Sequence, residues 1–198
     1  MKDLLHKSIR FSLSIAVITF VLAAIFSIIS TIMLSGVKWG VGMLLVLFIV
    51  LIGIFFDILG IASTSADETP FHAMASKKIK GSKQAILITR NADRFANFCN
   101  DVIGDISGII SGTASAIVII QIATSLGYEE VSAPQYIISV VFTSIVAALT
   151  VGGKAFGKSF AIRYSTDIIF RVGQILYVLE DKFKITLFKE HKKRKVRK

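Results

Sequence analysis

Four long apolar blocks divide the chain of 198 residues, and they limit its possible folds more than any other feature. The blocks cover residues 12–34, 41–63, 101–125 and 136–151. A transmembrane α-helix needs about 20 predominantly apolar residues. The mean hydropathy of +0.71 is also high for a soluble domain. The sequence therefore predicts an all-α integral membrane protein with four transmembrane helices, the first of which is retained rather than cleaved as a signal peptide.

The charged residues give these helices an expected orientation. The net charge of +10 resides mainly in residues 1–11, 64–100 and 152–198, whereas residues 126–135 contain two Glu and no Lys or Arg. Loops rich in Lys and Arg remain on the cytoplasmic side of a membrane. We therefore expect both termini in the cytoplasm, and the protein in the cytoplasmic (plasma) membrane.

The central polar segment, residues 64–100, contains signals for helices at the cytoplasmic surface. Ser65 and Glu68 have the spacing of a capping box, in which both side chains bond backbone amides at a helix start, and Pro70 suits the first turn. A second stretch, residues 84–98, is amphipathic. These patterns predict a cytoplasmic juxtamembrane helical hairpin that leads into the third span.

The segment after the fourth span predicts a C-terminal amphipathic helix. Its apolar residues recur at steps of three and four: Phe160, Tyr164, Ile168, Val172, Ile175, Leu179 and Phe183. Such a helix lies on the membrane surface or packs under the bundle. The polybasic tail that follows either binds anionic lipid head groups or only fixes orientation as a solvated segment. It has no RNA-binding motif, which argues against a nucleic-acid partner.

Two acidic residues, Asp101 and Asp105, lie one helical turn apart where the third span begins, next to Asn100. Carboxylate and amide oxygens are the ligands that Mg²⁺ prefers. An ionised group inside a membrane is also a candidate functional residue by default. The three residues are therefore candidate ligands for Mg²⁺ or another divalent cation. In the alternative interpretation, Asp101 stabilises the helix N-terminus and Asp105 pairs with a Lys or Arg.

Asp57 is the third acidic candidate, because it interrupts the second span. Inserting an unpaired carboxylate there costs about 2.5–3.5 kcal/mol, so Asp57 needs a cation, a proton or a basic partner. Lys154 is the alternative structural partner. Ser65 and Glu68 complete the set of candidate metal ligands, although the capping box favours a structural role for Glu68.

Small residues recur every fourth position in two spans. The two series are Gly104, Gly108 and Gly112 in the third span, and Ser144, Ala148 and Gly152 in the fourth. Small residues let transmembrane helices approach closely. The two series either pack on each other within one chain or form the contact of a homodimer.

Several local patterns also follow one another in a characteristic order: Phe55-Phe56, then Ser65-x-x-Glu68, then Asn91-Ala-Asp-Arg-Phe95, then the polar start of the third span, and then Gly153-Lys-Ala-Phe-Gly-Lys158 with Ser159-Phe-Ala-Ile-Arg163. They are similar to a Phe-Phe-x-x-x-Glu step, an Asn-Pro-x-x-Leu step and a Gly-Glu-x-x-Pro-Lys signature. In this set and order, residues 53–183 resemble the transmembrane domain of the CNNM/CorC (cyclin M-like) magnesium transporter family.

The resemblance implies a fold, a partner and an ion. It divides the chain into an N-terminal segment with an extra transmembrane helix (1–40), a CNNM/CorC-like transmembrane domain (41–183) and the polybasic tail (184–198). It implies a homodimer and transport of Mg²⁺. The family signature has a cation-site Glu where this chain has Lys154. The chain also has no CBS domains, so a separate cytoplasmic regulatory protein is an expected partner.

Two functions follow from these patterns. The first is a divergent CNNM/CorC-like membrane protein that handles divalent cations by transport or efflux, without CBS domains. The alternative, suggested by Lys154, is a non-transporting membrane scaffold or assembly partner of another membrane protein. The sequence has no nucleophile–base set and no phosphate-binding loop, so we do not expect an enzyme.

Overall fold

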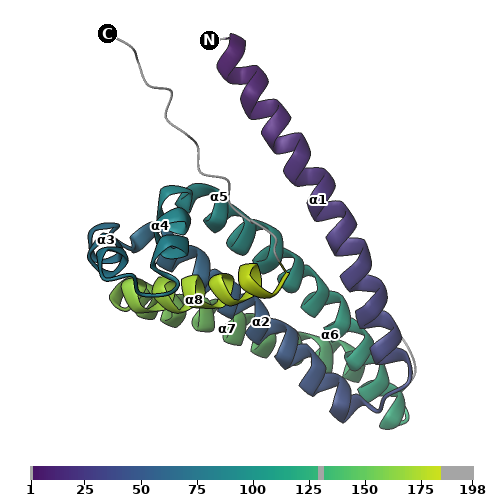
Figure 1. Ribbon diagram of the computed structural model, residues 1–198. Helices are drawn as coiled ribbons and strands as arrows, with labels where there is room; N and C mark the ends of the chain where they lie inside the picture. The colour runs from purple at the N-terminus through teal and green to yellow at the C-terminus, as the bar shows by residue number, and fades with distance from the viewer. Residues whose placement is uncertain (1, 129–131, 184–198) are drawn as a thin grey trace.

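The computed structural model describes residues 2–128 and 132–183, and the regular elements within them are all helical. The predictions for the polybasic tail fall outside the described residues. In chain order the elements are α1 (Lys2–Ser35), α2 (Trp39–Ser65), α3 (Thr69–Ser76), α4 (Ser82–Arg90), α5 (Ala92–Asn97), a π-helical segment η1 (Phe98–Gly104), α6 (Asp105–Ser125), α7 (Ala133–Arg163) and α8 (Ser165–Phe183) (Figure 1).

Four stretches of these helices are long and apolar enough to cross a membrane, which agrees with the predicted fold class. They are Ser12–Ser35, Trp39–Ser65, Ala92–Ser125 and Ala133–Arg163. The fourth of these stretches, helix α7, is much longer than the predicted span of residues 136–151. It continues because Gly153 and Gly157 allow close contact with α2, where added Cβ atoms would collide with Ile54 and Ile58.

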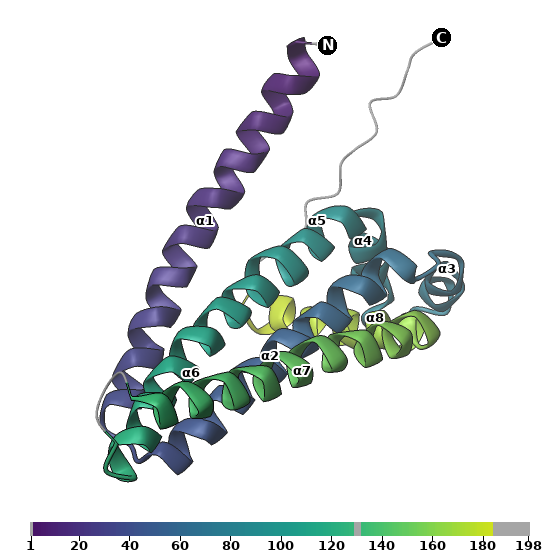
Figure 2. The ribbon, with the colours of Figure 1, turned by 180° about the vertical axis from the view of Figure 1, so that it is seen from behind.

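Helix α2 is the centre of the bundle. It packs against α6 and α7, and at its C-terminal end against α5, η1 and α8. Figures 1 and 2 show α2 running between α6 and α7 from opposite sides of the molecule. Any side chain on α2 that points inward is therefore met by residues far away in the sequence.

The end of the bundle that carries α3, α4 and α8 has a hydrophobic core of its own. Phe71, Ala85, Ile88 and Ile169 are all completely buried in one cluster. Burying a Phe or Ile side chain contributes about 1.5–3 kcal/mol. Helices as short as α3 and α4 depend on such packing, because isolated helices of this length are unstable in water.

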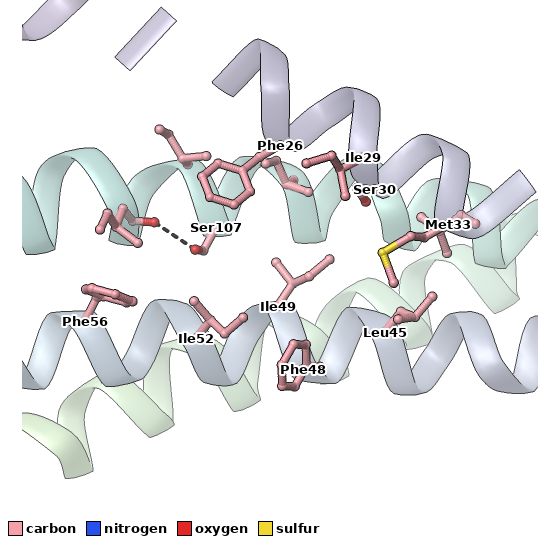
Figure 3. A pocket seen from close by; sticks show the side chains of 14 residues that line it. Phe26, Ile29, Ser30, Met33, Leu45, Phe48, Ile49, Ile52, Phe56 and Ser107 are labelled. Carbon is pink, nitrogen blue, oxygen red and sulfur yellow. Dashed lines mark hydrogen bonds between the residues drawn. The ribbon is translucent and has the colours of Figure 1, made fainter. Parts of the chain in front are cut away.

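Helix α1 separates from the other helices toward its N-terminus (Figures 1 and 2). Its C-terminal end is fixed: Leu34 is buried, and the carbonyl of Leu34 accepts a hydrogen bond from Gln121 Nε2 at 3.3 Å. Between α1, α2 and α6 lies an apolar groove of about 270 Å³ (Figure 3). Its lining includes Phe26, Met33, Phe48, Ile52 and Ile106. The first span therefore packs mainly on α6.

The predicted capping box at Ser65 and Glu68 is wrong. Ser65 is the last residue of α2, and its carbonyl oxygen accepts a hydrogen bond from Ser165 Oγ at 3.4 Å. Glu68 precedes α3 but makes no side-chain cap bond. Its Oε1 instead lies 2.6 Å from Arg90 Nε and 2.7 Å from His72 Nε2. Glu68 therefore bonds two side chains, Arg90 and His72, and not the backbone amides that the capping-box pattern predicts.

The amphipathic stretch predicted at residues 84–98 is not one helix. It breaks at Asn91, whose Nδ2 donates a hydrogen bond to the carbonyl of Leu87 at 2.8 Å, so α4 ends and α5 begins there. Ile88 is buried as expected, whereas Phe98 is 46% exposed because it lies beyond the break. Because the chain is divided into α4 and α5 at Asn91, residues 84–98 do not form the single apolar face that their spacing predicts.

The cluster of Glu68, His72 and Arg90 makes stability depend weakly on pH. Burial alone would raise the pKa of Glu68, but the hydrogen bonds and charges of His72 and Arg90 outweigh it and lower the pKa below its ordinary value of 4.5. Such a carboxylate stabilises the fold above its ordinary pKa, and the contribution is lost as the pH falls through the lowered pKa. We expect less than about 1 kcal/mol, because the groups are largely exposed.

Thermal unfolding of the wild type and of Glu68→Gln, measured from neutral pH to below pH 4.5, tests this. The melting temperatures of the two proteins should differ at neutral pH and converge in acid. A constant difference over the whole range would contradict the assignment.

Candidate functional site

An ion pair joins α2 and α7, two of the four helices that are long and apolar enough to cross a membrane. Lys154 Nζ of α7 lies 3.8 Å from Asp57 Oδ1 of α2, and the side chains are 31% and 15% exposed. This separation is that of an ion pair rather than of a good hydrogen bond. The basic partner that the alternative interpretation of Asp57 required is therefore present.

Asn100 lies in the π-helical segment η1, which packs against α2. Its Oδ1 is buried and accepts no hydrogen bond from the described residues. The side chain occupies the space above Gly60, where an added Cβ would collide with Oδ1. Gly60 is about one helical turn from Asp57 on α2, so the carboxamide of Asn100 lies near the level of the carboxylate.

The π-helical segment itself contacts Lys154. Gly104 is buried, and a Cβ added there would lie 3.8 Å from Lys154 Nζ. Single π-helical turns are rare and occur frequently at functional sites. We call Asp57, Asn100, Gly104 and Lys154 the polar layer. Lys154 lies beside Asp57 and Gly104, and Asn100 packs on Gly60, about one turn of α2 from Asp57.

Asp101 and Asp105 lie outside the polar layer. Both residues are exposed, and within the described part of the chain neither forms an ion pair. Ser65 and Glu68 lie farther along the chain, at the α2–α3 connection. Of the six predicted metal ligands, the structure therefore brings only Asp57 and Asn100 into the layer. Residues 2–128 and 132–183 contain no group of three or more His, Cys, Asp and Glu placed to hold a metal ion.

The two series of small residues do not pack on each other. Gly108, Gly112 and Gly152 have open space where a Cβ would be, and Ser144 and Ala148 are exposed. Helix α6 instead buries a neighbouring face of Ser107, Ser111, Ala114 and Ser115 against the bundle. Of the two alternatives, packing of the two series on each other is therefore wrong, although Gly104 itself is buried, and the homodimer contact stays a prediction.

Sequence reasoning missed the role of Gly60. A glycine in an apolar helix about one turn after an acidic residue is the signal that could have identified it, since glycine permits close approach of a polar side chain. In comparisons with known proteins, no family model, no curated protein and no solved structure matches the chain. The function is therefore argued from the geometry of the polar layer.

Proposed function

We propose that the chain is a membrane protein that handles divalent cations, Mg²⁺ first among them, and that an incoming cation competes with Lys154 for Asp57. The observation that carries this proposal is the Lys154 ammonium, which lies 3.8 Å from Asp57 Oδ1 beside the π-helical segment. Ionisable groups between transmembrane helices are costly and commonly mark an ion pathway. A positive charge already resides here, supplied by the chain itself.

The oxygens of the polar layer suit a hard divalent cation. Mg²⁺ usually takes one or two carboxylates and keeps several waters. Asp57 offers a carboxylate and Asn100 a buried oxygen without a hydrogen-bond donor among the described residues. At equal distance a doubly charged ion attracts Asp57 twice as strongly as an ammonium does. The exposed Asp101 and Asp105 would raise the local cation concentration near this layer.

The proposed orientation places both termini in the cytoplasm, with α3, α4 and α8 at the cytoplasmic face of the plasma membrane. This orientation is supported by four basic residues between the end of α3 and the first turn of α4: Lys77, Lys78, Lys80 and Lys83. Basic loops stay on the cytoplasmic side. The cation would then enter the polar layer from the cytoplasmic end of the bundle.

Isothermal titration with Mg²⁺ tests the proposal on purified wild type, Asp57→Asn, Asp105→Asn and Lys154→Gln. Removing the competing ammonium should raise Mg²⁺ affinity about tenfold, which corresponds to about 1.4 kcal/mol. Asp57→Asn should abolish binding, and Asp105→Asn should weaken it. Lys158→Gln, an exposed change one turn further along α7, is the matched control and should bind as the wild type does.

Two different outcomes would contradict two different parts of the proposal. Identical heats for the wild type and Asp105→Asn would remove Asp105 from the proposal. No Mg²⁺ heat in either the wild type or Lys154→Gln would remove cation handling.

The second candidate function is a membrane scaffold or assembly partner. It is favoured by the exposed position of Asp105 and Gly108 on α6, since an ionised residue on a spanning helix requires a partner in the membrane. Cross-linking in native membranes, combined with the Mg²⁺ tolerance of a deletion strain, distinguishes the two functions. A chain found without partners, with altered Mg²⁺ tolerance in its absence, would contradict the scaffold.

A further inference from the structure

Helix α8 has two apolar faces, and only one of them packs on the bundle. Ile169 is completely buried, Gly173 is buried and Leu176 joins the same core cluster, against α4 and α2. The other face carries Ile175 and Leu179, which are 60% and 39% exposed. The predicted apolar series on α8 is divided between the two faces: Ile168 and Val172 pack against the core cluster, whereas Ile175 and Leu179 are exposed.

The orientation of α8 about its axis is fixed. A Cβ added to Gly173 would lie 2.5 Å from the carbonyl oxygen of Gly81 and 2.9 Å from the backbone nitrogen of Ala85. Backbone atoms cannot move aside as a flexible side chain can. Rotation of α8 that buried Ile175 would bring larger side chains into this contact, so the second face stays outward.

Exposed apolar residues also occur at the end of α7, where the chain leads into α8. Phe156, Phe160 and Tyr164 are 77%, 45% and 42% exposed, and the rings of the last two lie 4.8 Å apart. The chain turns at Tyr164, and α8 then runs back from the end of α7 (Figure 2). Helix α7 is long and apolar enough to cross a membrane, so we expect its last turns and the start of α8 at a membrane boundary.

Basic residues accompany this face. Arg171 and Lys182 are exposed on α8, on the side of the helix next to Ile175. Lys158 and Arg163 are exposed on the last turns of α7, and the Arg163 guanidinium lies 5.7 Å from the centre of the Tyr164 ring. Apolar side chains bordered by Lys and Arg are typical of helices that lie in the interface of an anionic membrane.

We propose that this face is a docking surface for anionic phospholipids of the membrane in which the protein resides. Ile175, Leu179, Phe160 and Tyr164 contact the acyl chains near the head groups. Arg171 and Lys182 bind head-group phosphates. The proposal is independent of cation handling, because it uses no residue of the polar layer.

Fluorescence quenching by brominated lipids tests the surface on the full chain in vesicles. A bimane label is placed on Ile175→Cys, and the matched control is a label on Asp181→Cys, an exposed α8 position about a third of the circumference away. The native Cys99 is buried, so labelling is confined to the introduced thiol. Brominated phosphatidylcholine should quench the label at position 175 and leave the label at 181 accessible to aqueous iodide.

The charge component is measured with brominated phosphatidylglycerol. Its preference over brominated phosphatidylcholine at position 175 should fall about fivefold for each of Arg171→Gln and Lys182→Gln, and should be unchanged in Lys83→Gln on α4. Equal size-exclusion profiles establish that the variants are folded. A label at position 175 that is not quenched by lipid, whether iodide reaches it or another protein surface covers it, overturns the proposal. An unaltered lipid preference in both charge variants overturns it as well.

Discussion

Lys154→Gln should lower the melting temperature of the purified protein by about 4–8 °C. Removing one member of a buried ion pair costs about 3–5 kcal/mol, because the remaining charge is left without compensation. Lys154 is 31% exposed and the two atoms are 3.8 Å apart, so we expect a smaller loss of about 2 kcal/mol. In a chain of this length, each kcal/mol corresponds to about 2–4 °C.

A double variant separates the charge effect from a loss of packing. Asp57→Asn combined with Lys154→Gln removes both charges and should recover most of the lost stability, whereas the exposed control Lys158→Gln should melt as the wild type does. Mg²⁺ added to Lys154→Gln should raise its melting temperature if the cation enters the polar layer. A Lys154→Gln variant as stable as the wild type would show that the pair contributes nothing to the fold.

Gly173→Ala should destabilise the fold by about 1–3 kcal/mol, the usual effect of forcing a methyl group into a close-packed contact. The atoms that the new Cβ would meet are the backbone of Gly81 and Ala85, at 2.5 and 2.9 Å. Gly81 has a φ of 89°, a conformation that non-glycine residues rarely adopt, so this turn has little freedom to move away.

Gly152→Ala is the matched control, because a Cβ there has open space. Alanine is the better helix former by about 0.5–1 kcal/mol, so this variant should be unchanged or slightly more stable. Melting temperatures of both variants in the same detergent test the contrast. Equal effects of the two substitutions would contradict the described packing of α8.

The helical class and the number of long helices follow from the sequence because each span is a local property, a run of apolar residues of sufficient length. The C-terminal end of α7 could not be predicted in this way. Residues after position 151 are less apolar, yet α7 extends to Arg163 because Gly153 and Gly157 pack against α2. That contact depends on residues nearly 100 positions away, which no local pattern contains.

The capping-box error has the same origin. The spacing of Ser65 and Glu68 is correct for a capping box. In the folded chain, however, Arg90 Nε lies 2.6 Å from Glu68 Oε1 and forms an ion pair with it. A charge-assisted hydrogen bond is roughly twice as strong as a neutral one, so it prevails over the local alternative. Asp57 was predictable as a residue in need of a partner, and Lys154 as one of its alternatives. The position of Asn100 above Gly60 was not, because it requires the π-helical turn.

The central place of α2 has a consequence for synthesis. Asp57 is made 97 residues before Lys154 (154 − 57 = 97), and the ribosome adds about 5–20 residues per second. For about 5–20 s Asp57 is therefore without the basic partner that it has in the folded chain. If α2 enters a membrane before α7 is made, the Asp57 carboxyl must meanwhile be protonated, hydrated or matched by another positive group.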